Sequence, residues 1–271
     1  MVERREEEGI LLQIGKIPYL NCVPFFRGLT LRPHWKLVEG SPSRIGDLVR
    51  DWRLDAAPVP SAVYLDYNVQ QEYGLLGDLG IAVRKRVGSV CLFSKIPIEK
   101  LNAKQVHLTG ESNTSAKLLK LLLAKRFGVT PDYTTEKPES ADAQLLIGDE
   151  ALRRYTDHER ADGGHVYDLA DLWHEWKSLP FVFAVWVIKT GVADDLRTFI
   201  EKKLRASWLD TMQNLDTLAP ELSEMYKLAV PVVVDYLTNF QYHIGKEEHR
   251  ALHEFARELG SFEGTPVADA R

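Results

Sequence analysis

Hydrophobic and polar positions follow a repeating order from the start of the chain: a short apolar run, a polar turn, then a stretch with helical spacing. The run "LLQIGKI" predicts a first buried strand, and "SPSRIGDLVRDWRLD" predicts an amphipathic helix with Ser43 before it. The apolar face of this helix consists of Ile45, Leu48, Val49 and Trp52. "LDAAPVPSAVYL" then predicts a second, short strand, so the order strand, helix, strand predicts parallel pairing through a right-handed crossover.

The same order recurs in the middle of the chain. "VGSVCLFSK" at 87–95 is a further β-rich run, and "KQVHLTGESNTSAKLLKLLLAKRFG" predicts a strand, a polar turn and a helix. The buried stripe of that helix consists of Leu118, Leu119, Leu122 and Leu123. "ADAQLLIGDEALRRY" repeats the order once more. Ligands of open parallel sheets collect beyond the carboxyl ends of the strands, so we expect the functional site at these polar turns.

A long apolar strand is predicted by "LPFVFAVWVIK" at 179–189, and beyond it the pattern predicts helices only. One of these helices has the apolar face Leu196, Phe199, Ile200 and Leu204, and the last has Leu252, Phe255, Ala256 and Leu259. This layout predicts an α/β fold with two lobes around a central cleft. We expect residues 1–92 and 188–271 to form the first lobe, with the helical C-terminal tail packed on it, and residues 93–187 to form the second.

Composition narrows the classes of function. The 271 residues are 45% hydrophobic and 27% charged, which is typical of a globular protein with a real core. The formal net charge is -5, and the charges are mixed along the chain without a basic block, so nucleic acid is not an expected partner and a bound anion would need local positive potential. The first residues, "MVERREEEGILLQIGK", contain neither a secretory hydrophobic region nor a membrane span, so we expect a cytoplasmic protein.

The two cysteines, Cys22 and Cys91, lie inside apolar segments at no metal-binding or disulfide spacing, and we interpret them as buried thiols. His249 and His253 lie four residues apart, but a third ligand is not evident, so a solvated helix face is the better interpretation and no metal site is predicted.

Small neutral hydrogen-bonding groups gather at the ends of the predicted strands. They are Asn21, Ser41, Ser43, Ser61, Gly88, Ser89, Ser112, Asn113, Thr114, Ser115 and Gly148, with Asp149 next to the last. A nucleophile paired with a general base would look different, because an activated Ser or Cys needs a positioned base.

The strongest local signal is "GESNTSAKLL", where four polar residues from Ser112 to Ser115 begin a helix. Free N–H groups and the positive end of the helix dipole favour an anion such as a carboxylate there, although one of these residues could be only a helix cap. The same reasoning applies more weakly to "GSPSR", to which Arg44 could add a charge. Asp149 is either a helix cap or a ligand-binding or catalytic residue.

Seven segments in order carry a resemblance to a known family: "IPYLNCVPFF", "GSPSR", "LDAAPVPS", "VGSVCLFSK", "SNTSAKLLK", "LLIGDEAL" and "DLWHEWKSLPFVFAVW". From Ile14 to Lys189, and more weakly through "YHIGKEEHRALHEF", the chain closely resembles the chorismate dehydratases of menaquinone biosynthesis by the futalosine route. The resemblance implies a fold like that of the type II periplasmic binding proteins in a cytoplasmic enzyme. The related 1,4-dihydroxy-6-naphthoate synthases usually begin with a Ser-Pro-x-Pro-Asn-Asp turn, whereas this chain has Pro18-Tyr19-Leu20-Asn21, which favours the dehydratase.

The implied reaction converts chorismate, a dicarboxylate, to 3-[(1-carboxyvinyl)oxy]benzoate and water, with no metal or organic cofactor. We expect Asn21 and Ser89 to orient the enolpyruvyl side chain and the departing hydroxyl. The proton acceptor is either Asp149 or the enolpyruvyl carboxylate of the substrate, and we favour the latter. The substrate-binding residues expected are Tyr19, Ser43, Ser61, Gly88, Ser112, Asn113, Thr114, Ser115 and Gly148.

Other readings stay open. Lys16, Arg44 and Arg84 are candidates for neutralising the substrate, and a homodimer is one option for the oligomeric state. A small-anion binding protein without chemistry is a second class of function, since fold alone does not decide function. The naphthoate synthase is a third, and it would be indicated by a histidine lining the cleft.

Overall fold

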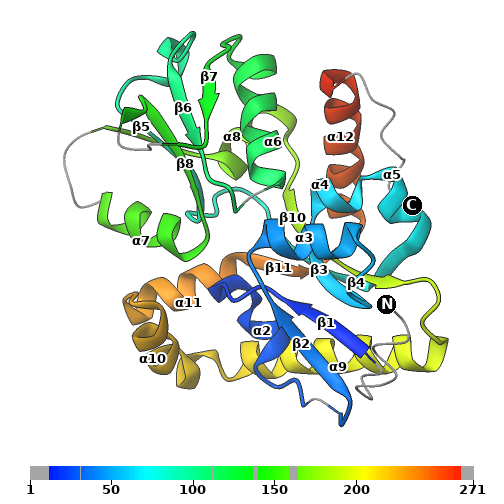
Figure 1. The fold of residues 1–271 in the computed structure, drawn as a ribbon. Helices are drawn as coiled ribbons and strands as arrows, with labels where there is room; N and C mark the ends of the chain where they lie inside the picture. Colours follow the sequence, from blue (N-terminus) through cyan, green and yellow to red (C-terminus); the bar gives the residue numbers. More distant parts are fainter. Residues whose placement is uncertain (1–11, 31, 112, 137–139, 159–163, 264–271) are drawn as a thin grey trace.

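The chain folds into two lobes, each built on one sheet covered by helices (Figure 1). The computed structural model describes residues 12–30, 32–111, 113–136, 140–158 and 164–263. The first sheet has the strand order β11-β4-β10-β3-β1-β2, and the second has the order β7-β6-β8-β5-β9.

The first sheet confirms the predicted parallel pairing of the first strand with the strand after the helix, although a strand that was not predicted, at 35–39, precedes that helix. Its strands are β1 (Leu12–Lys16), β2 (Trp35–Glu39), β3 (Ala56–Pro60), β4 (Tyr73–Val83), β10 (Phe181–Lys189) and β11 (Phe240–His243). β1 pairs in parallel with β2 and β3, and β10 runs antiparallel between β3 and β4. The prediction that strands end with β10 is wrong: β11 pairs antiparallel with β4, placing Phe240 opposite Val83. β11 has only four residues, too few to show a period-2 pattern.

The second sheet is mixed. Its strands are β5 (Val90–Ser94), β6 (Gln105–Leu108), β7 (Asp132–Thr134), β8 (Ala143–Ile147) and β9 (His165–Asp168). β6 runs parallel to β7 and β8, whereas β5 runs antiparallel to β8 and β9. The chain changes sheets between Val83 and Val90 and again before Phe181. The expected boundaries at 92/93 and 187/188 therefore fall inside β5 and β10, because the apolar pattern is continuous through both strands and does not mark the crossings.

Helices cover both sheets. They are α2 (Val23–Phe26), α3 (Pro42–Arg50), α4 (Ser61–Tyr64), α5 (Tyr67–Glu72), α6 (Thr114–Leu121), α7 (Gly148–His158), α8 (Leu169–Lys177), α9 (Asp194–Gln213), α10 (Leu215–Tyr226), α11 (Val230–Asn239) and α12 (Lys246–Glu263), with single turns η1 (Leu20–Cys22), η2 (Ile98–Lys100) and η3 (Leu122–Arg126). The leucine stripe predicted over α6 and η3 is buried in full, which confirms that helical face.

Helix α3 begins earlier and ends earlier than predicted. Ser41, not Ser43, is its N-cap, accepting a hydrogen bond from the Arg44 N–H, because Pro42 is favoured at the first helical position. Trp52 lies beyond the helix with φ 57°, and its side chain is 41% exposed, so its placement on the buried face was wrong.

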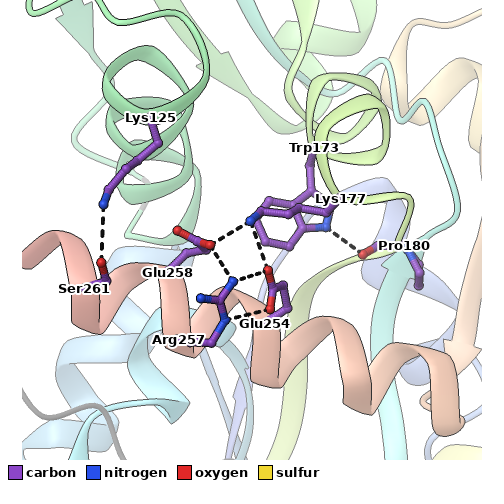
Figure 2. Close-up of polar contacts among 8 residues, drawn as sticks. All are labelled: Lys125, Trp173, Lys177, Pro180, Glu254, Arg257, Glu258 and Ser261. Carbon is purple, nitrogen blue, oxygen red and sulfur yellow. Dashed lines mark hydrogen bonds and ion pairs between the residues drawn. The ribbon is translucent and has the colours of Figure 1, made fainter.

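The C-terminal helix α12 packs on the first lobe, as expected, and also contacts the second. Its buried face meets β10, where Phe255 contacts Phe181 edge-on at a centroid distance of 5.1 Å. Its polar face meets α8 of the second lobe, where Lys177 pairs with Glu254 at 2.9 Å and with Glu258 at 2.6 Å (Figure 2). The helical pattern identified the buried face, but not the partners of the polar one.

Candidate functional site

A cavity of about 580 Å³, counting the space open to solvent at its mouth, lies between the lobes. The first lobe lines it with Ile17, Tyr19, Asn21, Cys22, Pro42, Pro60, Ile81, Phe183 and Ala184, the second lobe with Val90, Thr114, Ser115, Ile147 and Gly148, and the crossing segment between β4 and β5 with Val87 and Ser89. The cavity lies beside the ends of several strands, where the sequence predicts polar turns.

Six of the predicted site residues line this cavity: Tyr19, Asn21, Ser89, Thr114, Ser115 and Gly148. Ser43, Ser61, Gly88, Asn113 and Asp149 are not among the lining residues, and Ser112 lies outside the described residues. Ser61 is fully buried, and its hydroxyl donates to the Val182 carbonyl oxygen at 2.6 Å, so it joins α4 to β10. The Ser43 backbone N–H donates to the Glu111 carbonyl oxygen of the second lobe at 3.0 Å.

Asn21 lies in the single turn η1 that follows β1, and it lines the cavity. Its side-chain oxygen Oδ1 is buried and accepts no hydrogen bond from the described residues. Such an unsatisfied acceptor costs about 1–3 kcal/mol until a ligand donor reaches it.

Asp149 supports the turn that carries Asn21. Its carboxylate Oδ1 accepts a hydrogen bond from the Leu20 N–H at 3.0 Å, across from the second lobe to the first. Burial raises the pKa of Asp149 to about 6, while the Leu20 N–H and the Arg153 charge act in the opposite direction. The Asp149 carboxylate thus bonds the opposite lobe, and this hydrogen bond stabilises the position of η1.

Tyr19 and Gly148 meet across the cleft. A Cβ atom at Gly148 would come within 2.8 Å of the Tyr19 ring, and the φ of Gly148 is +65°, so both packing and backbone require glycine there. The Tyr19 hydroxyl donates to the Glu111 carboxylate at 2.7 Å. Burial raises the pKa of Tyr19, and the hydrogen bond with Glu111 adds to this, so the phenol stays neutral.

Hydrogen bonds to Asp168 and Gly148 hold the turn at Ser89 in place. Asp168 accepts the N–H groups of Val87 at 2.8 Å and Gly88 at 2.6 Å, and the φ of Gly88 is +72°, which favours glycine. The Ser89 carbonyl accepts the Gly148 N–H at 2.8 Å. Gly88 therefore shapes the turn, and Ser89 next to it lines the cavity.

Tyr236 is a residue of the site that sequence reasoning missed. Its hydroxyl donates to Ser89 Oγ at 2.8 Å from helix α11. Nothing in the apolar segment "VPVVVDYLTN" distinguishes this tyrosine from an ordinary core residue. Its role depends on a contact between residues 147 positions apart in the chain.

Three helices begin at the cavity. Pro42, Thr114 and Gly148 belong to the first residues of α3, α6 and α7, and all of them line the cavity. N–H groups at such helix starts favour negative charge. None of the described residues that line the cavity is Lys, Arg, His, Asp or Glu.

The predicted cations do not line the cavity. Lys16 pairs with Glu39 at 2.7 Å, and Arg84 pairs with Glu247 at 2.8 Å, both at exposed positions. Arg44 lies in the first turn of α3, beyond the lining residue Pro42.

Other kinds of chemistry receive no support from the described part of the chain. Cys22 lines the cavity, but burial raises the pKa of its thiol well above the ordinary value, so it stays protonated and is a poor nucleophile. Both cysteines are buried and free, as predicted. Within the described ranges, no three His, Cys, Asp or Glu side chains gather in a group that could hold a metal ion. No described helix is both long and apolar enough to cross a membrane.

Solved structures with this fold include binding proteins. A protein from Archaeoglobus fulgidus matches with a TM-score of 0.75 at 18% identity, covering 93% of this chain and 97% of that one. The alkanesulfonate-binding protein of Xanthomonas axonopodis pv. citri, bound to MOPS, matches with a TM-score of 0.67 at 16% identity, covering 96% of each chain. At these identities the likeness concerns the fold alone, and it confirms the predicted two-lobe, periplasmic-binding-protein-like α/β fold.

Sequence relatives identify the family more specifically than the solved structures do. The chain is 33% identical over 266 residues to the chorismate dehydratase of Thermus thermophilus, covering 91% of this chain and 94% of that protein. It is 31% identical over 177 residues to the chorismate dehydratase of Campylobacter jejuni, covering 63% and 64%. A family model described as menaquinone biosynthesis matches residues 12–260. Because this model spans most of the chain, the chain belongs to the menaquinone biosynthesis family.

Proposed function

We propose that this protein is a chorismate dehydratase, a hydro-lyase that converts chorismate to 3-[(1-carboxyvinyl)oxy]benzoate and water. The observation that carries the proposal is the cavity itself. It offers helix starts and neutral donors to a dicarboxylate, and its described lining contains no acidic, basic or histidine side chain. The two chorismate dehydratases that share 31–33% identity with the chain support the same reaction.

Binding of the dianion follows from the helix starts. The first residues of α3, α6 and α7 line one cavity, and a helix start favours negative charge by its dipole. At α3 and α7 the Ser43 and Gly148 N–H groups already donate to carbonyl oxygens of the protein, so we assign the ring carboxylate to the start of α6. Charge moves onto that carboxylate when the C3 proton leaves, because C3–H is vinylogous to it, so fixed N–H donors stabilise the transition state more than the bound substrate.

Proton removal is assigned to the substrate. The C3–H bond breaks, its proton passes to the enolpyruvyl carboxylate, and its electron pair forms the third double bond of the ring. The C4–O bond breaks, and the departing oxygen takes the proton and leaves as water. Asp149 is bonded to Leu20 and is not a lining residue, which supports a positioning role for it instead of the role of base.

Asn21 and Ser89 are assigned the role of orienting the enolpyruvyl group and the departing hydroxyl of the substrate. The unpartnered Asn21 Oδ1 is an acceptor for a substrate O–H, and a hydroxyl on C4 is such a donor. Ser89 lines the same cavity and can donate to oxygen as charge develops on it.

The experiment that tests the function is incubation of the purified protein with chorismate, followed by chromatography with mass detection. We expect a product lighter than chorismate by one water, formed at an equal rate with and without a chelator. A second substrate tests the assignment of the base: chorismate with its enolpyruvyl carboxylate converted to an amide should bind without losing water. Dehydration of that amide at a rate close to that of chorismate would contradict the substrate-assisted step.

The naphthoate synthase receives less support. It would be indicated by a histidine lining the cleft, and the described lining residues include none. A binding protein without chemistry is the reading that remains if a folded protein binds chorismate and leaves it unchanged.

A further inference from the structure

The hydroxyl of Ser89 is held by a tyrosine from the C-terminal part of the chain. Tyr236 on α11 donates its hydroxyl hydrogen to Ser89 Oγ at 2.8 Å. Both residues are buried, with 4% of Tyr236 and 1% of Ser89 exposed. Burial raises the pKa of Tyr236 well above its ordinary value, so the phenol keeps the proton that it donates.

The hydrogen bond from Tyr236 determines the direction in which the Ser89 hydroxyl can donate its own hydrogen bond. A serine hydroxyl has one hydrogen to donate and two lone pairs that accept. Because Tyr236 occupies a lone pair, the Ser89 hydrogen has to point away from Tyr236. No described residue accepts it, and Ser89 lines the cavity, so a ligand oxygen there is its available acceptor.

Tyr236 is itself fixed in position. Its ring meets Phe240 edge-on at a centroid distance of 4.9 Å, and Phe240 is paired with Val83 in the first sheet. The end of α11 is also tied to the crossing segment, because Asn239 donates its side-chain N–H to the Arg86 carbonyl oxygen. A donor on such a rigid frame loses little conformational entropy when it orients its acceptor.

We propose that Tyr236 is a positioning residue for the dehydration: it commits Ser89 to donate its hydrogen bond to the oxygen that leaves C4. This role rests on the proposed function. As the C4–O bond breaks, its electron pair stays on oxygen, and the oriented Ser89 hydroxyl stabilises the charge that develops there. Tyr236 acts through Ser89 and does not contact the substrate.

The first test compares two tyrosine variants that lose the same atom. Tyr236→Phe removes the donor, and we expect kcat to fall about tenfold with KM changed less than about twofold. Tyr242→Phe is the matched control, because Tyr242 is equally buried on neighbouring β11 and its hydroxyl has no partner among the described residues. Its kcat should stay within about twofold of wild type. Unchanged kcat in a folded Tyr236→Phe protein would overturn the proposal.

The second test separates an effect through Ser89 from a general effect on folding. In the Ser89→Ala background, adding Tyr236→Phe should change kcat by less than about twofold, because the group that Tyr236 positions is gone. A further tenfold loss in that background would overturn the proposal. Tyr236→3-fluorotyrosine keeps the donor, so its kcat should stay at or above the wild-type value, and a loss similar to that of Tyr236→Phe would also contradict the role.

Wild-type activity distinguishes the two levels of failure. A folded wild-type protein that releases no water from chorismate overturns the proposed function, and the role of Tyr236 falls with it. An active wild type whose Tyr236→Phe and Ser89→Ala effects multiply independently overturns the positioning role alone.

Discussion

The Asp149 carboxylate of the second lobe accepts the Leu20 backbone N–H of the first lobe at 3.0 Å, one residue before Asn21. This bond crosses the cleft at the turn that presents the Asn21 amide to the cavity. Closure of the two lobes and the placement of Asn21 are therefore coupled through one side chain.

Asp149→Asn should keep the turn in place, since an amide oxygen can still accept the Leu20 N–H. We expect kcat to stay within about tenfold of wild type, whereas Asp149→Ala, which removes the acceptor, should lower it further. Steady-state kinetics with both variants provide the measurement. Loss of all turnover in Asp149→Asn, with the fold intact, would instead identify Asp149 as the base.

The same aspartate predicts a pH dependence of stability. Its pKa is raised from 3.8 to about 6 by burial, so the folded state holds the proton more tightly than the unfolded state. The resulting stabilisation is complete below pH 3.8 and is lost as pH rises through about 6. Asp149→Asn should therefore be more stable than wild type at pH 8, by about 1–3 kcal/mol, and lose about half of this advantage at pH 5. Urea unfolding at both pH values measures the difference, and an equal difference at the two would count against the raised pKa.

Asn21→Ala should lower kcat by about a hundredfold and change KM by less than about threefold, because the amide acts mainly in the transition state. Asn68→Ala, at an exposed asparagine of α5, is the control and should behave like wild type. A variant with normal kcat and a large rise in KM would show that Asn21 only binds the ground state.

Gly148→Ala should disturb the cavity as well as the backbone. A left-handed alanine costs about 1–2 kcal/mol, and the added Cβ would also push against the Tyr19 ring, 2.8 Å away. Gly128→Ala is a matched control, because Gly128 has the same φ of +65° and no described atom lies within 4 Å of the place that its Cβ would take. We expect both variants to lose stability, but only Gly148→Ala to lose kcat/KM by about tenfold or more. Equal kcat/KM values in the two variants would contradict the expected clash between the added Cβ and the Tyr19 ring.

Lys177 on α8 forms ion pairs with Glu254 and Glu258 on α12, and we expect these pairs to stabilise the contact between the two helices (Figure 2). Lys177→Met removes the cation from Glu254 and Glu258, and we expect a loss of about 1–2 kcal/mol in the free energy of unfolding. Lys125→Met is the control, because Lys125 makes one exposed contact with Ser261 at 3.3 Å. Denaturant unfolding of both variants tests this, and equal stability would contradict it.

Glu254 in this cluster adds a pH dependence of opposite sign. The hydrogen bond from Arg257, with that from Lys177, lowers the pKa of Glu254 to about 2. Its contribution is therefore complete above pH 4.5 and is lost as pH falls toward 2.

The sequence allowed the strand ends to be found, because small polar residues interrupt apolar runs there. Asn21, Ser89 and Gly148 were identified in this way, and all of them line the cavity. Ser61 shows the limit of that reasoning. It also follows a strand, but its hydroxyl turns to the Val182 carbonyl oxygen, and that choice depends on packing against a strand 121 residues away.

Long-range contacts also explain the other omissions. Tyr236 reaches Ser89 from an apolar helix, and β11 becomes a strand only because β4 offers it an edge. Periodicity describes the face of one element, so it cannot reveal which distant side chain completes a hydrogen bond.

The most direct test of the central claim uses chorismate carrying deuterium at C3. We expect an aromatic product that is lighter by one molecule of water containing that deuterium, with a primary isotope effect wherever proton removal limits the rate. Unchanged chorismate with a folded protein, or a product that retains the deuterium, would contradict it.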